Sequence, residues 1–294
     1  MVATMKILIA IDASAGSEAV IQEVNARPWP SGSTFSVLTV VEPPYASEIP
    51  DVYVPAMKEA DRLVRSAAES FRAGGLQAVA VVKEGDPKAV ILEEAGRTSA
   101  DLLMLGASGH SGLTRFLVGS VARTAVRFAP CSVEIVRPRV QKQPGANDGM
   151  RILLATDGSK CSALAAQSIA RRPWPANSEF EIASVVEPQF TLSLPQVFLD
   201  SAAMEEMRAN DMKRTQKAIM EAEETLANAG FKVSEAVFIP LGAPKELILA
   251  EAEKWQADLV FVGSHGRRWI KHFLLGSVSE AVAMHANCSV EVIR

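Results

Sequence analysis

Cysteine is scarce in this chain of 294 residues, which has only Cys131, Cys161 and Cys288. They form neither a CxxC pair nor an even set, so the sequence gives no sign of a disulfide framework. Three unpaired thiols are typical of a reducing compartment, and we therefore expect a cytoplasmic protein.

The chain also lacks an excess of either charge and any long apolar run. Thirty basic and 34 acidic side chains give a net charge of -4, without the basic surface that nucleic acid requires. No apolar run approaches the ~20 residues of a membrane-spanning helix, and the first six residues do not resemble a signal peptide. We expect no nucleic-acid partner and no membrane partner.

Several common catalytic motifs are missing as well. The chain contains no GxxxxGK[ST] loop, no HExxH helix and no GxSxG turn. The four histidines do not lie at metal-ligand spacing beside a carboxylate or a cysteine, which favours packing or solvated roles. We predict no catalytic residues.

What the sequence does contain is an internal repeat. Three segments recur after 145 residues, which chance does not readily produce. The pairs are 6–12 with 151–157, 27–30 (RPWP) with 172–175 (RPWP), and 40–43 (VVEP) with 185–188 (VVEP). Further along, Gly85 and Gly119 match Gly242 and Gly276 after 157 residues, so the second copy carries 157 − 145 = 12 extra residues. We expect this insertion between Gln189 and Asp211.

The repeat divides the chain into two halves of ordinary domain size. We expect a first domain over residues 1–137, a linker over 138–149 that contains Pro138, Pro144 and Gly145, and a second domain over 150–294. They are called the first half and the second half below.

Within each half, short apolar segments alternate with helical patterns. In the first half we predict strands over 7–11, 35–41, 78–82, 102–105 and 133–136, and helices over 18–25, up to Gly74, 89–97 and 121–128. Strands that are apolar throughout are typical of parallel sheets covered on both faces. The predicted fold class is α/β, with two tandem, doubly wound, five-stranded parallel sheets of Rossmann-like type.

A glycine-rich loop after the fourth strand is the most informative motif. The first half has Gly106 and Gly109, then nine residues, then Gly119-Ser120; the second half has Gly263, Gly266 and Gly276-Ser277 at the same spacing. Such glycines let backbone amides approach an anion, and a helix start favours phosphate. A Gly-Ser helix start is also an ordinary N-cap, but two identical copies favour a phosphate site.

These motifs resemble the universal stress protein family over nearly the whole chain: a strand ending in Asp, a second strand ending in Val-Val-Glu, and GxxG, nine residues, GS. The resemblance implies a domain of the adenine nucleotide alpha hydrolase-like type that binds ATP or another adenine nucleotide. It also implies pairing through the last strand.

The resemblance assigns roles to particular residues. Asp12 and Asp157 would approach the ribose, or a Mg ion held only through the bound nucleotide, while Val40 and Val185 would meet adenine. The remaining implied nucleotide-binding positions are Ile11, Gly106, Gly109, Gly119, Ser120 and Val121 in the first half, and Thr156, Gly263, Gly266, Gly276, Ser277 and Val278 in the second.

The two halves depart from each other at the implied site. The first half has Ala13 where the second has Gly158, and the second half has Arg268-Trp269 where the first has Ser111-Gly112. We expect the two sites to differ, with the first at least as able to bind a ligand as the second.

Three functions remain open at this stage. They are a nucleotide sensor read by an unknown protein partner in a stress response, an enzyme with at most slow ATP hydrolysis, and a scaffold that holds no ligand. The apolar last strands, 133–136 and 290–293, should pair with each other inside one chain, and whole chains could form a homodimer.

Overall fold

The computed structural model describes residues 4–43, 50–108, 118–139, 149–186, 201–239, 243–266 and 275–294. The first half contains β1 (Lys6–Ala10), α1 (Ala15–Ala26), β2 (Thr34–Val41), α2 (Pro50–Ala73), β3 (Gln77–Glu84), α3 (Pro87–Arg97), β4 (Leu102–Gly106), α4 (Ser120–Phe128) and β5 (Ser132–Val136). The second half contains β6 (Arg151–Ala155), α5 (Lys160–Ala170), β7 (Glu179–Val185), α6 (Ser201–Asn228), β8 (Val233–Ile239), α7 (Pro244–Lys254), β9 (Leu259–Gly263), α8 (Ser277–His285) and β10 (Ser289–Ile293).

The ten strands of the described residues belong to one continuous sheet, in the order β3-β2-β1-β4-β5-β10-β9-β6-β7-β8. Within each half every pair is parallel, and the strand order reverses between the first and the fourth strand of that half. The predicted doubly wound α/β fold is therefore confirmed. The halves meet where β5 pairs antiparallel with β10, which confirms the expected pairing of the last strands within one chain.

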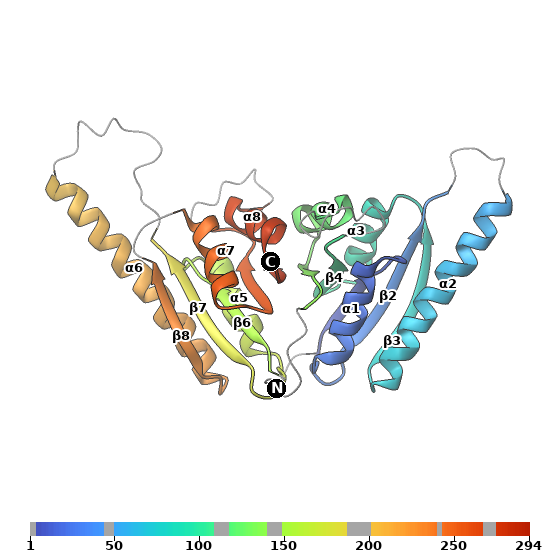
Figure 1. Cartoon of the computed structure of the whole chain (residues 1–294), viewed down its shortest axis with the longest axis horizontal. Helices are drawn as coiled ribbons and strands as arrows, with labels where there is room; N and C mark the ends of the chain where they lie inside the picture. Colours follow the sequence, from blue (N-terminus) through green and yellow to red (C-terminus); the bar gives the residue numbers. More distant parts are fainter. Residues whose placement is uncertain are drawn as a thin grey trace.

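The strands are buried because helices cover both faces of the sheet. α1 and α2 pack on one face of the first half, and the matching outer core of the second half is formed by α5 and α6. On the other face, a single apolar cluster runs through α3, α4, α7 and α8 of both halves. These four helices lie towards the middle of the molecule, and α2 and α6 lie on its outer sides (Figure 1). One apolar core therefore joins the two halves.

The extra residues of the second half are distributed over three places. Gly75 and Gly230 end the turns after α2 and α6 with the same positive φ, so the offset there is 230 − 75 = 155 and ten extra residues precede Gly230. A register shift in the β7–β8 pairing adds one more near Ser234, and the last follows β8. The sequence repeat predicts all twelve extra residues between 189 and 211. This expectation is wrong for the residue near Ser234 and for the residue after β8.

Among the described residues, no helix is long and apolar enough to cross a bilayer.

Candidate functional site

Three strands of the second half end beside one another. β6 lies between β7 and β9, and parallel strands place their carboxyl ends at one edge of the sheet. A cavity of about 500 Å³ opens at this edge, in the size range of about 300–1,000 Å³ that is typical of small-molecule sites. All eight sequence-predicted positions of this half line it: Thr156, Asp157, Val185, Gly263, Gly266, Gly276, Ser277 and Val278.

The start of α8 faces this cavity without a side-chain cap. Gly276 is the N-cap residue of α8, and it has no side chain with which to accept from the first amides. α5 differs, because its N-cap Ser159 accepts a hydrogen bond from the amide of Ser162 at 3.2 Å. The first N–H groups of a helix need an acceptor, and α8 begins where Ser277 and Val278 line the cavity. The α8 start is therefore the place where an anionic group fits.

Asp157 lies against the glycine-rich loop. Its Oδ1 accepts a hydrogen bond from the amide of Ser159 at 2.9 Å. Its Oδ2 lies only 2.8 Å from the position that a Cβ atom on residue 266 would occupy. Gly266 is therefore required for the close approach of the loop to the strand end. Both residues line the cavity, so a carboxylate and the loop backbone face the same space.

In the first half, the equivalent aspartate is bound by its own helix. Oδ1 of Asp12 accepts from the amide of Ser14 at 3.1 Å, from Oγ of Ser17 at 2.8 Å, and from Oγ of Ser14. Ser162, which replaces Ser17 in the second half, instead donates to the carbonyl of Ser159 at 3.0 Å. The Asp12 carboxylate is therefore engaged by three donors that turn it towards α1.

The remaining first-half positions occupy the matching edge of the sheet. Ile11 follows β1, Val40 lies near the end of β2, and Gly106 ends β4. Gly119 is the uncapped N-cap of α4, and Ser120 and Val121 are its first residues. Gly109 lies outside the described residues, as do Ser111-Gly112 and Arg268-Trp269, so the predicted difference between those loop segments is not described.

The loop after β4 also comes closer to its helix in the first half. Gly16 of α1 lies so near that a Cβ atom on it would be 2.2 Å from the carbonyl oxygen of Ser108. The second half has Cys161 at this position, 145 residues later, so its loop cannot approach α5 in the same way. At this point the chain following β4 lies against the backbone of α1, where the second half has the side chain of Cys161.

One cavity-lining residue that the sequence did not suggest is Arg214 of α6. Its side chain is 65% exposed, and its ion pair to Asp211 on the same helix is long, at 3.8 Å. Because of the insertion before α6, the 145-residue offset does not match Arg214 with its counterpart in α2. The equivalent turns at Gly75 and Gly230 give the correct offset of 155, which matches Arg214 with Glu59.

The thiols and the loop histidine are further candidates for functional groups. Burial raises the pKa of Cys131 to about 11 and that of Cys288 to about 12, so both stay protonated at neutral pH. All three thiols are free. His265 lines the cavity, and its Nδ1 lies 3.1 Å from Oγ of Ser264. Of these groups, only His265 faces the candidate ligand space.

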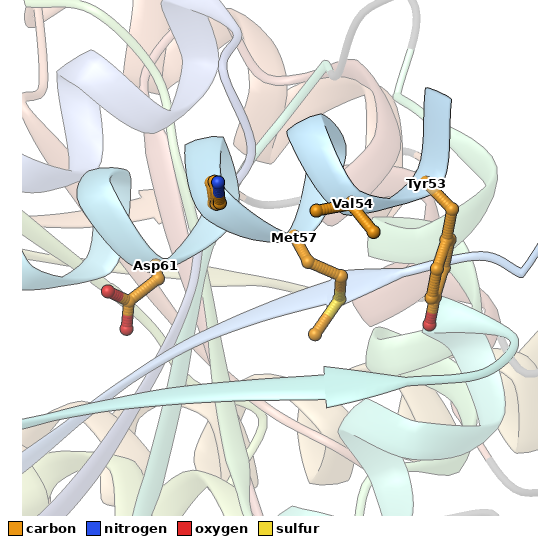
Figure 2. A pocket seen from close by; sticks show the side chains of 5 residues that line it. Tyr53, Val54, Met57 and Asp61 are labelled. Atoms are coloured by element: carbon orange, nitrogen blue, oxygen red, sulfur yellow. The ribbon is translucent and has the colours of Figure 1, made fainter. Parts of the chain in front are cut away.

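A second hollow, of about 390 Å³, lies along the start of α2 in the first half (Figure 2). Every lining residue comes from α2: Tyr53, Val54, Met57, Lys58 and Asp61. It contains none of the predicted site residues. We therefore place the candidate site in the second half.

No group of three or more His, Cys, Asp or Glu side chains among the described residues is arranged to hold a metal ion. A Mg ion beside Asp157 would therefore need ligand oxygens from a phosphate, in keeping with the limited role that the resemblance implies.

Comparisons with known proteins agree with this architecture. The model of the Universal stress protein family matches residues 4–137 and 150–294. A protein of Staphylococcus epidermidis that bears the name of a universal stress protein is 32% identical over 144 residues, which are 47% of this chain and 86% of that protein. The structure of a universal stress protein from Archaeoglobus fulgidus has a TM-score of 0.63 at 22% identity and covers 99% of this chain and 96% of its own. Because the family match spans both halves, the chain belongs to the universal stress protein family.

Proposed function

We propose that the second half binds ATP or another adenine nucleotide in the cavity beyond β6, β7 and β9. The observation that carries this proposal is the α8 start, which has no side-chain cap and opens into a cavity that also contains Asp157. Helix starts attract phosphate because unpaired amides and the positive end of the helix dipole converge there.

The lining residues support a particular placement of the nucleotide. Phosphate would lie at Gly276, Ser277 and Val278, where the backbone amides of α8 begin. Adenine would lie against the buried end of β7 at Val185, and apolar Ile248 of α7 lines the same cavity. The Asp157 carboxylate would then face the ribose or a Mg ion bound to phosphate.

We place the nucleotide in the second half, whereas the sequence alone suggested a first site at least as able to bind. Oδ1 of Asp12 accepts from the hydroxyls of Ser14 and Ser17, which hold this carboxylate towards α1. The cation of the second site, Arg214, is replaced by Glu59 in the first half, which would repel phosphate. We propose one nucleotide per chain.

A sensor role fits this placement better than catalysis. α8 would hold the phosphate at its start, and Glu280 near that start accepts from Nε of Arg127 on α4 at 2.8 Å. A ligand that shifts α8 would therefore act on a contact between the two halves. The three free thiols support a cytoplasmic setting, where a protein partner would read this change.

Nucleotide carried through gentle purification tests the proposal. Mass spectrometry of the full chain should find an adenine nucleotide at about one per chain, or calorimetry should find one site after the protein is emptied. Asp157→Ala should lose this nucleotide, while the matched change Asp12→Ala should keep it. A chain that neither carries nor takes up adenine nucleotide would refute the proposal and leave a scaffold.

A further inference from the structure

Arg214 is the one Lys or Arg side chain among the described residues that line the second-half cavity. It comes from α6, whereas the predicted phosphate positions come from the loop after β9 and from α8. Its side chain is 65% exposed, and its ion pair with Asp211 is 3.8 Å long. A weak pair on the same helix leaves donors of the guanidinium available for an anion at the cavity mouth.

A close contact between two small residues brings Arg214 to this position. Gly158 follows Asp157 with φ +75°, and a Cβ atom on it would lie 3.1 Å from Cβ of Ala218 on α6. Arg214 lies four residues before Ala218, and residues i and i+4 share one face of a helix. The helix face that touches the Asp157 turn therefore also carries the guanidinium.

The first half has different residues at all three positions of this arrangement. Ala13 replaces Gly158, and the offset of 155 places Leu63 at Ala218 and Glu59 at Arg214. Glu59 forms an exposed ion pair with Arg62 on its own helix. The second half therefore has both the contact between Gly158 and Ala218 and the positive charge of Arg214. The equivalent positions of the first half have neither feature.

We infer that Arg214 makes the second site selective for nucleotides that carry more than one phosphate. The first phosphate is held by the amides at the α8 start, and a second or third phosphate extends towards the guanidinium of α6. Arginine suits this task because its planar fork donates two hydrogen bonds to phosphate oxygens. This inference rests on the proposed nucleotide site and adds to it the number of phosphates.

Titration of the full chain with ATP, ADP and AMP tests the inference. The wild-type chain should bind ATP at least about tenfold more tightly than AMP, the effect of one charge-assisted contact. Arg214→Ala should weaken ATP binding by about tenfold and change AMP binding by less than about twofold. Arg214→Glu, which introduces the charge of the first half, should weaken ATP binding further.

The control is Lys217→Ala, since Lys217 lies on the next turn of α6, is 75% exposed and does not line the cavity. It should leave both affinities unchanged. Equal losses of ATP and AMP in Arg214→Ala, or an unchanged ratio of the two affinities, would overturn the role of Arg214 while leaving the nucleotide site in place. Failure of the wild-type chain to bind any of the three would refute the site itself.

Discussion

Glu134 of β5 and Glu291 of β10 lie directly opposite each other in the antiparallel pair that joins the two halves, and both are completely buried. Burial raises the pKa of Glu134, although Arg27 opposes this, and the charge of Glu291 raises it further. Each carboxylate is held by the arginine of an RPWP repeat: Arg27 Nη2 lies 2.7 Å from Glu134, and Arg172 Nη1 lies 2.7 Å from Glu291. The repeated RPWP segment therefore neutralises charge at the seam between the halves.

Removing one of these arginines should be costly. We expect Arg172→Met to lower the free energy of unfolding by about 3–5 kcal/mol, because it leaves the Glu291 carboxylate buried without its partner. The double variant Arg172→Met, Glu291→Met removes both charges and should regain most of that loss. Urea unfolding at pH 7 measures both values. If the double variant is no more stable than the single one, the loss comes from packing instead of an unpaired charge.

A second pair of arginines connects the halves reciprocally. Arg137 follows β5 and donates to the carbonyls of Ala283 at 2.8 Å and Cys288 at 3.0 Å in the second half. Arg294 follows β10 and donates to the carbonyl of Val126 in the first half. Burial lowers the pKa of Arg137 to about 10, which still leaves it charged at neutral pH.

We expect Arg137→Leu to lower the free energy of unfolding by about 2–3 kcal/mol, because the buried carbonyl of Ala283 and the partly buried carbonyl of Cys288 lose their donor. Arg137→Lys should recover only part of this, since one ammonium does not reproduce the planar fork. Chemical unfolding of the three proteins provides the comparison. Full recovery by lysine would show that charge matters at this position and the two-carbonyl geometry does not.

Glu181 of β7 is a buried acid whose two oxygens have no hydrogen-bond partner among the described residues. Burial raises its pKa to about 7, and the nearby charges of Glu251 and Glu235 add to the effect. In the first half, the matching position is Ser36, and the buried Glu94 is paired with Arg97 and Lys83. Glu181 is therefore an acid that the first half lacks. The second half also lacks the cation Lys83, because Val40 pairs with Lys83 in the first half and its counterpart Val185 pairs with Ile239.

This difference predicts a pH dependence of stability. A folded-state pKa of about 7, above the ordinary 4.5, means that the folded chain holds a proton that the unfolded chain releases. Stability from this group is therefore complete below about pH 4.5 and is lost as the pH rises through about 7. Glu181→Ser should raise the free energy of unfolding by roughly 1–3 kcal/mol at pH 8 and by little at pH 4.5.

Urea midpoints of Glu181→Ser and the wild-type chain, measured between pH 4.5 and pH 8, check this expectation. Glu179→Ser, at a partly exposed residue of the same strand, controls for the loss of one negative charge. A stability difference that does not change with pH would show that Glu181 has an ordinary pKa.

Much of this fold could be predicted because the sequence repeats itself. The 145-residue offset and the wholly apolar strands indicated two doubly wound halves, and the apolar last strands indicated how they join. The eight second-half positions that the sequence singled out line one cavity because parallel strands end at the same edge. Their role as ligand contacts stays a prediction.

Other features depend on distances that a repeat does not encode. The hydroxyls of Ser14 and Ser17 turn Asp12 towards α1, although the same residue types stand at Ser159 and Ser162. Arg214 was missed because insertions at three places shift the match between α2 and α6. The opposition of Glu134 and Glu291 follows from the register of one strand pair, which apolar patterning does not specify.

In the proposed site, the α8 start would bind phosphate because no side chain caps it. Gly276 has φ -71° and ψ 144°, which suits an aspartate N-cap, and a Cβ atom there would need only a small shift of the Ser264 carbonyl, 3.2 Å away. Gly276→Asp should therefore keep or raise stability while it places a carboxylate where phosphate would bind. Calorimetric titration with ATP should show binding lost in Gly276→Asp and retained in the matched first-half variant Gly119→Asp. Wild-type affinity in a folded Gly276→Asp chain would show that the α8 start does not hold the phosphate.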